Sequence, residues 1–236
     1  MKDDLIKTIK SGGYWRVNFQ PIVLQNIPSL QKCSEIIEKN KVRLRGWDYP
    51  HVQIMQNENG GMQPCGNYWE SWTDWGASKE FWRMYKSGQF LYYKALREDW
   101  YEGDFFYNDL GPLIKPLTSL SVIGSVIFEV TEMFEFLSRL LQEGLYKEGV
   151  LVSISLENIK NRILRVDDSR RLPFSYERKT GASKVEYGKV LSADEVINNS
   201  KLLANSFIRE VFDLFGWNPS EEQILADQEK LLKGLI

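Results

Sequence analysis

The sequence has few of the residues that usually build metal or nucleophile sites. Its 236 residues include one histidine, His51, and two cysteines, Cys33 and Cys65. Neither cysteine has a second cysteine or a histidine at metal-ligand spacing, so we expect no structural zinc site, no other metal and no cofactor. Two thiols without a secretory signal are typical of a reducing compartment.

Long hydrophobic runs are also missing. Residues 1–7 mix both charges and lack the apolar segment of a signal peptide. The longest apolar stretch, residues 117–128, is interrupted by serine, threonine and glycine and is too short to span a bilayer. We therefore expect a cytoplasmic protein without a membrane partner.

A strong excess of one charge is the third feature that the chain lacks. Its net charge of −2 excludes a surface built throughout to hold polyanions, so any contact with nucleic acid must be local. Aromatic residues, in contrast, make up 13% of the chain, and six of the eight tryptophans lie between Trp47 and Trp100. Tryptophans supply buried area or flat stacking surfaces, and we favour an aromatic core.

Hydrophobic periodicity predicts the order of the elements. Strands are expected at residues 14–20, 42–47, 52–55, 68–75, 81–96 (two strands around a turn at 87–88) and 150–156. Helices are expected at 30–40, 119–143, 192–215 and 220–232, with a loop at 98–116. The early strands are joined by connections too short for helical crossovers, which indicates antiparallel pairing. We predict one α+β domain over residues 1–236, an antiparallel meander sheet packed against long helices from the carboxyl half.

The densest group of functional side chains is the segment Arg-Leu-Arg-Gly-Trp-Asp-Tyr-Pro-His at residues 43–51. As a strand, it would place Arg43, Arg45 and Trp47 on one face, where guanidinium groups can hold phosphate and an indole can stack on a base. The candidate ligand or partner residues are Arg43, Arg45, Trp47, Tyr49, His51 and Arg83.

A structural interpretation competes with this platform. The segment at residues 68–74 places Glu70, Trp72 and Asp74 on one strand face, the charge complement of Arg43 and Arg45 if the two strands are neighbours. We favour this internal pairing. On the predicted helix at 119–143, the charges at 132, 135, 139 and 143 are likewise spaced for ion pairs within the helix.

His51 gives a catalytic alternative, because its ordinary pKa lies near neutrality. Asp48 and Glu80 are the carboxylates that would assist it in a hydrolase or nuclease. A nucleophile is missing, since Cys33 falls on an apolar helix face and Cys65 lies in a turn. We assign no catalytic residue on this evidence.

Residues 160–189 contain nine basic and four acidic side chains, a local excess of five positive charges in an acidic protein. This asymmetry favours contact with nucleic acid or an acidic partner, with Arg170, Arg171, Arg178 and Lys179 as candidate contacts. The structural alternative is a solvated β-hairpin with its tip at residues 178–181.

Four segments carry a resemblance: Tyr-Trp-Arg-Val at 14–17, Arg-Gly-Trp-Asp-Tyr-Pro-His at 45–51, residues 82–90 and residues 131–136. Together they resemble a group of uncharacterised prokaryotic proteins, some of them associated with AlbA-like, Schlafen-type DNA-binding domains. The resemblance implies a role in prokaryotic regulation or phage defence. The chain has no AlbA-like segment, so DNA binding by that route is not implied.

The sequence therefore predicts a non-catalytic binding or sensing module that acts with a protein or nucleic-acid partner. Two alternatives stay open at this point. One is the hydrolase or nuclease that uses His51. The other is a structural subunit whose exposed aromatic side chains form a homo-oligomer interface.

Overall fold

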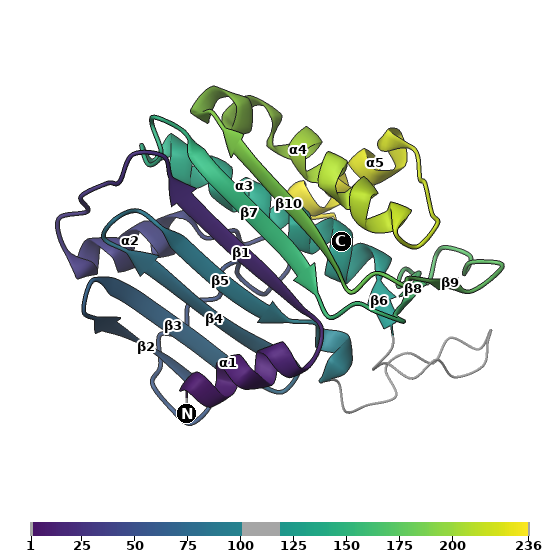
Figure 1. Cartoon of the computed structure of the whole chain (residues 1–236), viewed down its shortest axis with the longest axis horizontal. Coiled ribbons are helices and arrows are strands. Elements are labelled where there is room, and N and C mark those ends of the chain that lie inside the picture. The colour runs from purple at the N-terminus through teal and green to yellow at the C-terminus, as the bar shows by residue number, and fades with distance from the viewer. Residues whose placement is uncertain (1, 101–118, 236) are drawn as a thin grey trace.

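A computed structural model describes residues 2–100 and 119–235. Within these ranges, seven strands form one antiparallel sheet in the order β10-β7-β1-β5-β4-β3-β2 (Figure 1). The strands are β1 (Tyr14–Pro21), β2 (Gly60–Cys65), β3 (Tyr68–Trp75), β4 (Ser78–Tyr85), β5 (Phe90–Ala95), β7 (Val150–Glu157) and β10 (Lys184–Leu191). Strands β2 to β5 form a meander joined by short turns. The predicted strands correspond to β3, β4 and β5, whereas β2, which includes Cys65, was not predicted.

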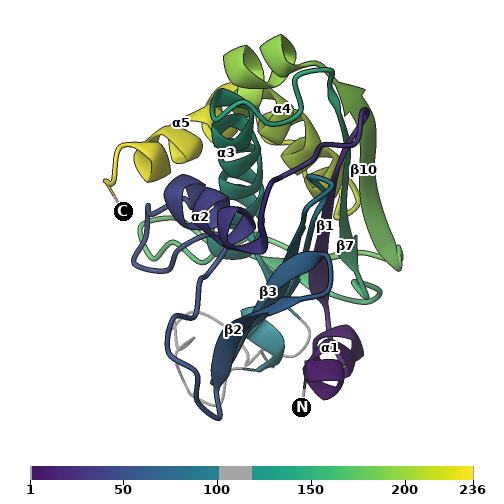
Figure 2. The same ribbon diagram turned by 90° about the vertical axis from the view of Figure 1, so that its left-hand side faces the viewer.

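The helices cover the two faces of the sheet unequally. They are α1 (Lys2–Ser11), α2 (Leu30–Asn40), α3 (Glu129–Gln142), α4 (Ala193–Asp213) and α5 (Glu221–Leu232). Figure 2 shows α2, α3 and α5 on one side of the sheet and α1 on the other. Three of these helices, including the longest, come from the carboxyl half, which confirms the predicted α+β architecture. No helix in the described part of the chain combines the length and apolar character needed to cross a membrane.

Serine caps begin three of the predicted helices. The Ser29 hydroxyl accepts a hydrogen bond from the backbone N–H of Lys32 at 3.0 Å, and Ser192 caps α4 in the same way. Ser220 and Gln223 form a complete capping box at the start of α5. Such caps satisfy backbone donors that a helix leaves unpaired at its first turn.

The largest core lies between the sheet and helices α2 to α5. Alternation along β1 buries Trp15, Val17 and Phe19 on that face. A smaller cluster, which includes Trp72 and Phe81, lies beneath α1 on the other face. Most of the aromatic side chains are thus structural, whereas Trp75 is 66% exposed.

The predicted strand at residues 42–47 is wrong. Only Val42 and Tyr49 form a backbone bridge, which closes the intervening residues into a loop. Gly46 in this loop has a φ of +75°, a conformation that breaks a strand and that glycine adopts without strain. Residues 52–55 do not form a strand either.

The helix predicted from residue 119 begins later than expected. Residues Ser119–Ser121 form the short strand β6, and Val122–Phe128 form a π-helical segment, η3, that leads into α3. β6 belongs to a small sheet with β8 (Ile163–Arg165) and β9 (Arg178–Lys179). Arg97–Asp99 form a 3-10 turn, η1, and most of the predicted loop at 98–116 lies outside the described residues.

Candidate functional site

A cleft of about 790 Å³ lies at one end of the sheet, where the β3–β4 turn, the loop after residue 44, η1 and the start of α3 come together. Its volume is in the range of small-molecule sites. The walls consist of Arg45, Trp47, Glu58, Asn59, Asp74, Trp75, Gly76, Ala77, Ser78, Lys79, Lys94, Arg97, Trp100 and Glu129.

Three tryptophans contribute flat surfaces to this cleft. The ring centres of Trp47 and Trp75 are 6.3 Å apart, and Trp75 at the β3–β4 turn is largely exposed. Trp100 follows η1, and the Lys79 ammonium lies 4.9 Å from its ring centre. The Trp47 indole is fixed, because its Nε1 donates a hydrogen bond of 2.6 Å to Glu80. The cleft therefore offers stacking surfaces from three separate parts of the chain.

Buried charges form the floor of the cleft. Glu80 on β4 and Lys94 on β5 are cross-strand partners, with 3.4 Å between Lys94 Nζ and Glu80 Oε1. Lys94 Nζ also lies 2.8 Å from Glu129 Oε1 at the start of α3. Tyr92 donates a hydrogen bond of 2.8 Å to the second oxygen of Glu80. The sheet and the helical layer are thus joined here by ion pairs in place of apolar packing.

Arg45 extends this floor from the loop. Its guanidinium lies 2.5 Å from Glu129 Oε1 and makes two hydrogen bonds to Glu132, of 2.7 and 3.0 Å. It also donates to the backbone oxygen of Gly124 in η3, at 3.1 Å. The π-helical segment therefore supplies one of the acceptors that hold Arg45 in place.

The charges of this floor do not balance. Among the described residues, Glu80, Glu129 and Glu132 face two cations, Arg45 and Lys94, so this cluster, when fully ionised, has one excess negative charge. Burial, together with repulsion from Glu129, raises the pKa of Glu132 to about 7, although Arg45 opposes this shift. Burial also acts on Glu129, but Lys94 and Arg45 hold its pKa below the ordinary value. Glu132 is thus the carboxyl group that takes up a proton near neutrality.

The rim of the cleft carries one cation that is not neutralised. Lys79 pairs with Asp74 across the β3–β4 hairpin. Arg97 is exposed and makes no ion pair with any residue in the described ranges. It is therefore the guanidinium at this site that remains available to an anion.

The residues of segment 43–51 separate in the structure. Arg45 and Trp47 line the cleft, whereas Arg43 lies outside it, paired with Glu38 at 3.0 Å. Tyr49 is buried against Tyr92, and burial raises the pKa of its hydroxyl well above the ordinary value. The segment is not one platform, because its loop conformation directs neighbouring side chains to different surroundings.

Internal pairing of the arginines is present, but the expected partners are wrong. Glu70 binds Arg83 across β3 and β4, with an N–O distance of 3.0 Å, and Asp74 binds Lys79. Arg83 thus lies on the sheet, away from the cleft walls. Because residues 42–47 form no strand, they are not a neighbour of β3, and their arginines turn to Glu38 and to α3 instead.

His51 stacks on Trp47, with ring centres 4.0 Å apart and planes inclined by 17°. Its Nδ1 is buried and has no hydrogen-bond partner among the described residues. Asp48 pairs with Lys41 at 2.8 Å, and Glu80 is held by Trp47 as described above. Within the described ranges no hydrogen bond joins His51 to either carboxylate, so the acid–base alternative stays a prediction.

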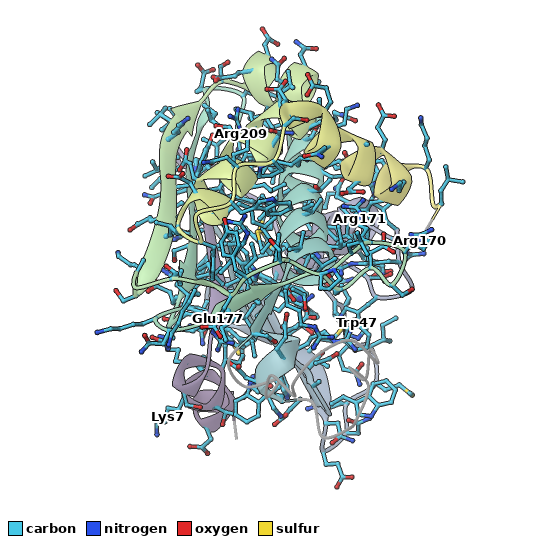
Figure 3. The ribbon with its side chains drawn as sticks, turned by 90° about the vertical axis from the view of Figure 1, so that its right-hand side faces the viewer. Lys7, Trp47, Arg170, Arg171, Glu177 and Arg209 are labelled. Carbon is cyan, nitrogen blue, oxygen red and sulfur yellow. The ribbon has the colours of Figure 1, made fainter. Side chains whose placement is uncertain are left out.

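The basic segment uses most of its arginines internally. Arg170 pairs with Asp168, and Arg171 pairs with Asp168 and with Asp227 on α5. Arg178 donates to the backbone oxygen of Gly216 and packs on Phe174 and Tyr176. Lys179 is exposed on β9. Figure 3 shows Arg170 and Arg171 near α5 and away from Trp47.

Sequence reasoning did not identify Lys94, Arg97, Glu129 or Glu132 as parts of a site. Glu132 was expected to form an ion pair within its helix, but it is buried and binds Arg45, while Glu135 and Arg139 do pair within α3. A usable signal was present: residues 129, 132 and 136 share one helix face, and a carboxylate on a buried face needs a cation. No group of histidine, cysteine or acidic side chains in the described ranges is arranged to hold a metal ion.

Comparisons of this chain with protein-family models, with curated proteins and with solved structures found no match.

Proposed function

We propose that this protein is a non-catalytic binding module that holds a nucleotide unit of a nucleic-acid partner in the aromatic cleft. The observation that carries the proposal is the convergence on one cavity of Trp47, Trp75 and Trp100 with Arg97, which forms no ion pair with the described residues. Indole rings stack on bases of any sequence, and a guanidinium fork binds phosphate oxygens. The cleft combines both requirements.

The charged floor supports binding because it fixes the stacking surface. Each of its ionised groups already has partners: Lys94 lies between Glu80 and Glu129, and Arg45 bridges two carboxylates. Such a network fixes the position of Trp47 through Glu80 and keeps the stacking surface rigid. A rigid aromatic surface loses little entropy when a ring stacks on it.

Titration with adenosine and uridine monophosphates tests the proposal, with tryptophan fluorescence and calorimetry as readouts. We expect Trp75→Ala to weaken binding roughly tenfold, because a stacked base contributes about 1–3 kcal/mol. Trp75 is 66% exposed, so this variant should fold normally. Tyr176→Ala is the matched control, since Tyr176 is 62% exposed and lies outside the cleft.

Arg97→Ala should weaken binding of the same nucleotides and reduce the salt dependence of log Kd by about one unit of slope, the effect of losing one phosphate contact. Arg209→Ala, an exposed arginine outside the cleft, is its control. Absence of binding at millimolar nucleotide, or unchanged affinity in both cleft variants, would show that the cleft does not bind nucleotides.

A further inference from the structure

A second cavity, of about 400 Å³, shares Trp100 with the aromatic cleft. It is formed by the turn between α1 and β1, the end of η1 and the loop that follows β7. Its walls include Gly12, Gly13, Asp99, Trp100, Lys160 and Arg162. Because one indole belongs to both cavities, a ligand that stacks in the first is adjacent to the second.

The wall of this second cavity is built around a buried ion pair between Asp99 and Arg162, each with 7% of its side chain exposed. The backbone N–H of Gly13 also donates to Asp99, at 2.6 Å. A Cβ atom at Gly12 would lie 2.6 Å from Asp99 Oδ2, and one at Gly13 would lie 2.5 Å from the Arg162 guanidinium. Glycine at both positions therefore allows the backbone to close on the ion pair.

Two buried polar atoms beside this cavity lack partners among the described residues. They are Oδ1 of Asp99, an acceptor, and Nε1 of Trp100, a donor. A buried polar atom without a hydrogen bond is unfavourable, and native proteins leave few of them. Sugar hydroxyls and base edges supply both donors and acceptors, which are the two kinds of partner that these atoms lack among the described residues.

Each cavity also has one cation that forms no ion pair with the described residues: Arg97 in the first and Lys160 in the second. The other cations in the two walls are neutralised by Asp74, by Asp99 or by the floor carboxylates. Both free cations are exposed, as contacts to a solvated phosphate backbone require.

We propose that the second cavity is a nucleotide subsite, so that the ligand is a single strand of at least two nucleotides that passes Trp100 from one cavity to the other. Lys160 contacts the phosphate of the second unit, while the side chains of Asp99 and Trp100 contact its sugar or base. The inference rests on the proposed function of the aromatic cleft, which holds the first unit.

The test compares uridine monophosphate with oligouridylates of two, three and six nucleotides by calorimetry at fixed salt. We expect affinity to rise about tenfold from one unit to two, in keeping with the contribution of one more bound base, and to change little beyond three. Lys160→Ala should remove most of this gain and leave the affinity for the mononucleotide unchanged. Lys179→Ala, at a lysine that is also exposed but lies outside both cavities, should leave both affinities unchanged.

The outcomes distinguish this inference from the proposed function. Equal affinity for the monomer and the oligomers would overturn the second subsite while the aromatic cleft stands as a nucleotide site. A loss in Lys160→Ala that is as large for the monomer as for the oligomers would also overturn it. No binding of any of the four ligands would remove both proposals.

Discussion

Arg45 and Arg171 each bridge two carboxylates, but they do so in different surroundings. Arg45 pairs with Glu129 and Glu132 at the cleft floor, where the three side chains are 18%, 5% and 1% exposed. Arg171 pairs with Asp168 and Asp227 beneath α5, and its own side chain is 34% exposed. Both arginines contact two carboxylates, but water has more access to Arg171 than to Arg45.

The two clusters also have opposite excess charges. Within the part of the chain that the structure describes, the floor has three carboxylates for two cations, whereas the cluster beneath α5 has Arg170, Arg171 and Lys230 for two carboxylates. Water and salt can screen the excess charge at the surface but not in the floor. The floor therefore responds by protonation of Glu132, whose pKa is raised to about 7. A cluster with unequal numbers of charges is therefore solvated when it is exposed, and one of its groups changes protonation when it is buried.

The largest effect expected from this difference follows removal of Arg45. Arg45→Met leaves Glu129 and Glu132 buried, with Lys94 as the one remaining cation of the cluster among the described residues. We expect a loss of about 3 kcal/mol in the free energy of unfolding, because removing one partner strands a buried charge. Urea denaturation at pH 8, where Glu132 is ionised in the native cluster, measures the loss.

Arg43→Met is the matched control, since Arg43 lies two residues away, is 62% exposed and also contacts two carboxylates. Exposed pairs of this kind contribute at most about 1 kcal/mol. Equal losses in the two variants would contradict the distinction between buried and exposed clusters.

The second largest effect is a pH dependence of the free energy of unfolding, caused by Glu132 in the cleft floor. Between pH 4.5 and about 7 the folded protein retains the Glu132 proton that the unfolded chain has released. The contribution of this group is therefore fully present below pH 4.5 and is lost as pH rises through about 7. Glu132 alone lowers the free energy of unfolding by up to about 3 kcal/mol across this window.

Glu132→Gln isolates this contribution, because glutamine resembles the protonated carboxyl group. We expect the variant to gain stability relative to the native protein as pH rises from 5 to 8, measured by urea denaturation at each pH. A stability difference that stays constant over this range would mean that Glu132 does not titrate there.

Local signals in the sequence were sufficient for most of the fold. Alternation predicted β1 and β3, and the helices expected at 30–40, 192–215 and 220–232 correspond to α2, α4 and α5. The same alternation failed at residues 42–47, because the positive φ of Gly46 depends on the closing bridge between Val42 and Tyr49. Period-two spacing alone does not distinguish a strand from a loop with alternating side chains.

The candidate site was predicted only in part. Arg45, Trp47 and Glu80 were named from the sequence; the first two line the cleft, and Glu80 holds the Trp47 indole. The partners of these residues were not predicted, because Arg45 and its partner Glu129 are 84 positions apart in the chain. The start of α3 lies over β4 and β5 because of the topology of the whole sheet. No local sequence pattern encodes that arrangement.

The smallest effect is expected beneath α5. Arg171→Ala should lower the free energy of unfolding by about 1 kcal/mol, because Asp227 is 4% exposed but keeps Lys230 at 3.1 Å. Since Arg171 is partly exposed, 1 M salt should reduce this loss, whereas the loss in Arg45→Met should persist. Urea denaturation at low and high salt measures both, with Arg170→Ala, at an exposed position of the same cluster, expected to match the native protein. A loss at Arg171 as large as the loss at Arg45, and as insensitive to salt, would mean that the cluster beneath α5 behaves as a buried one.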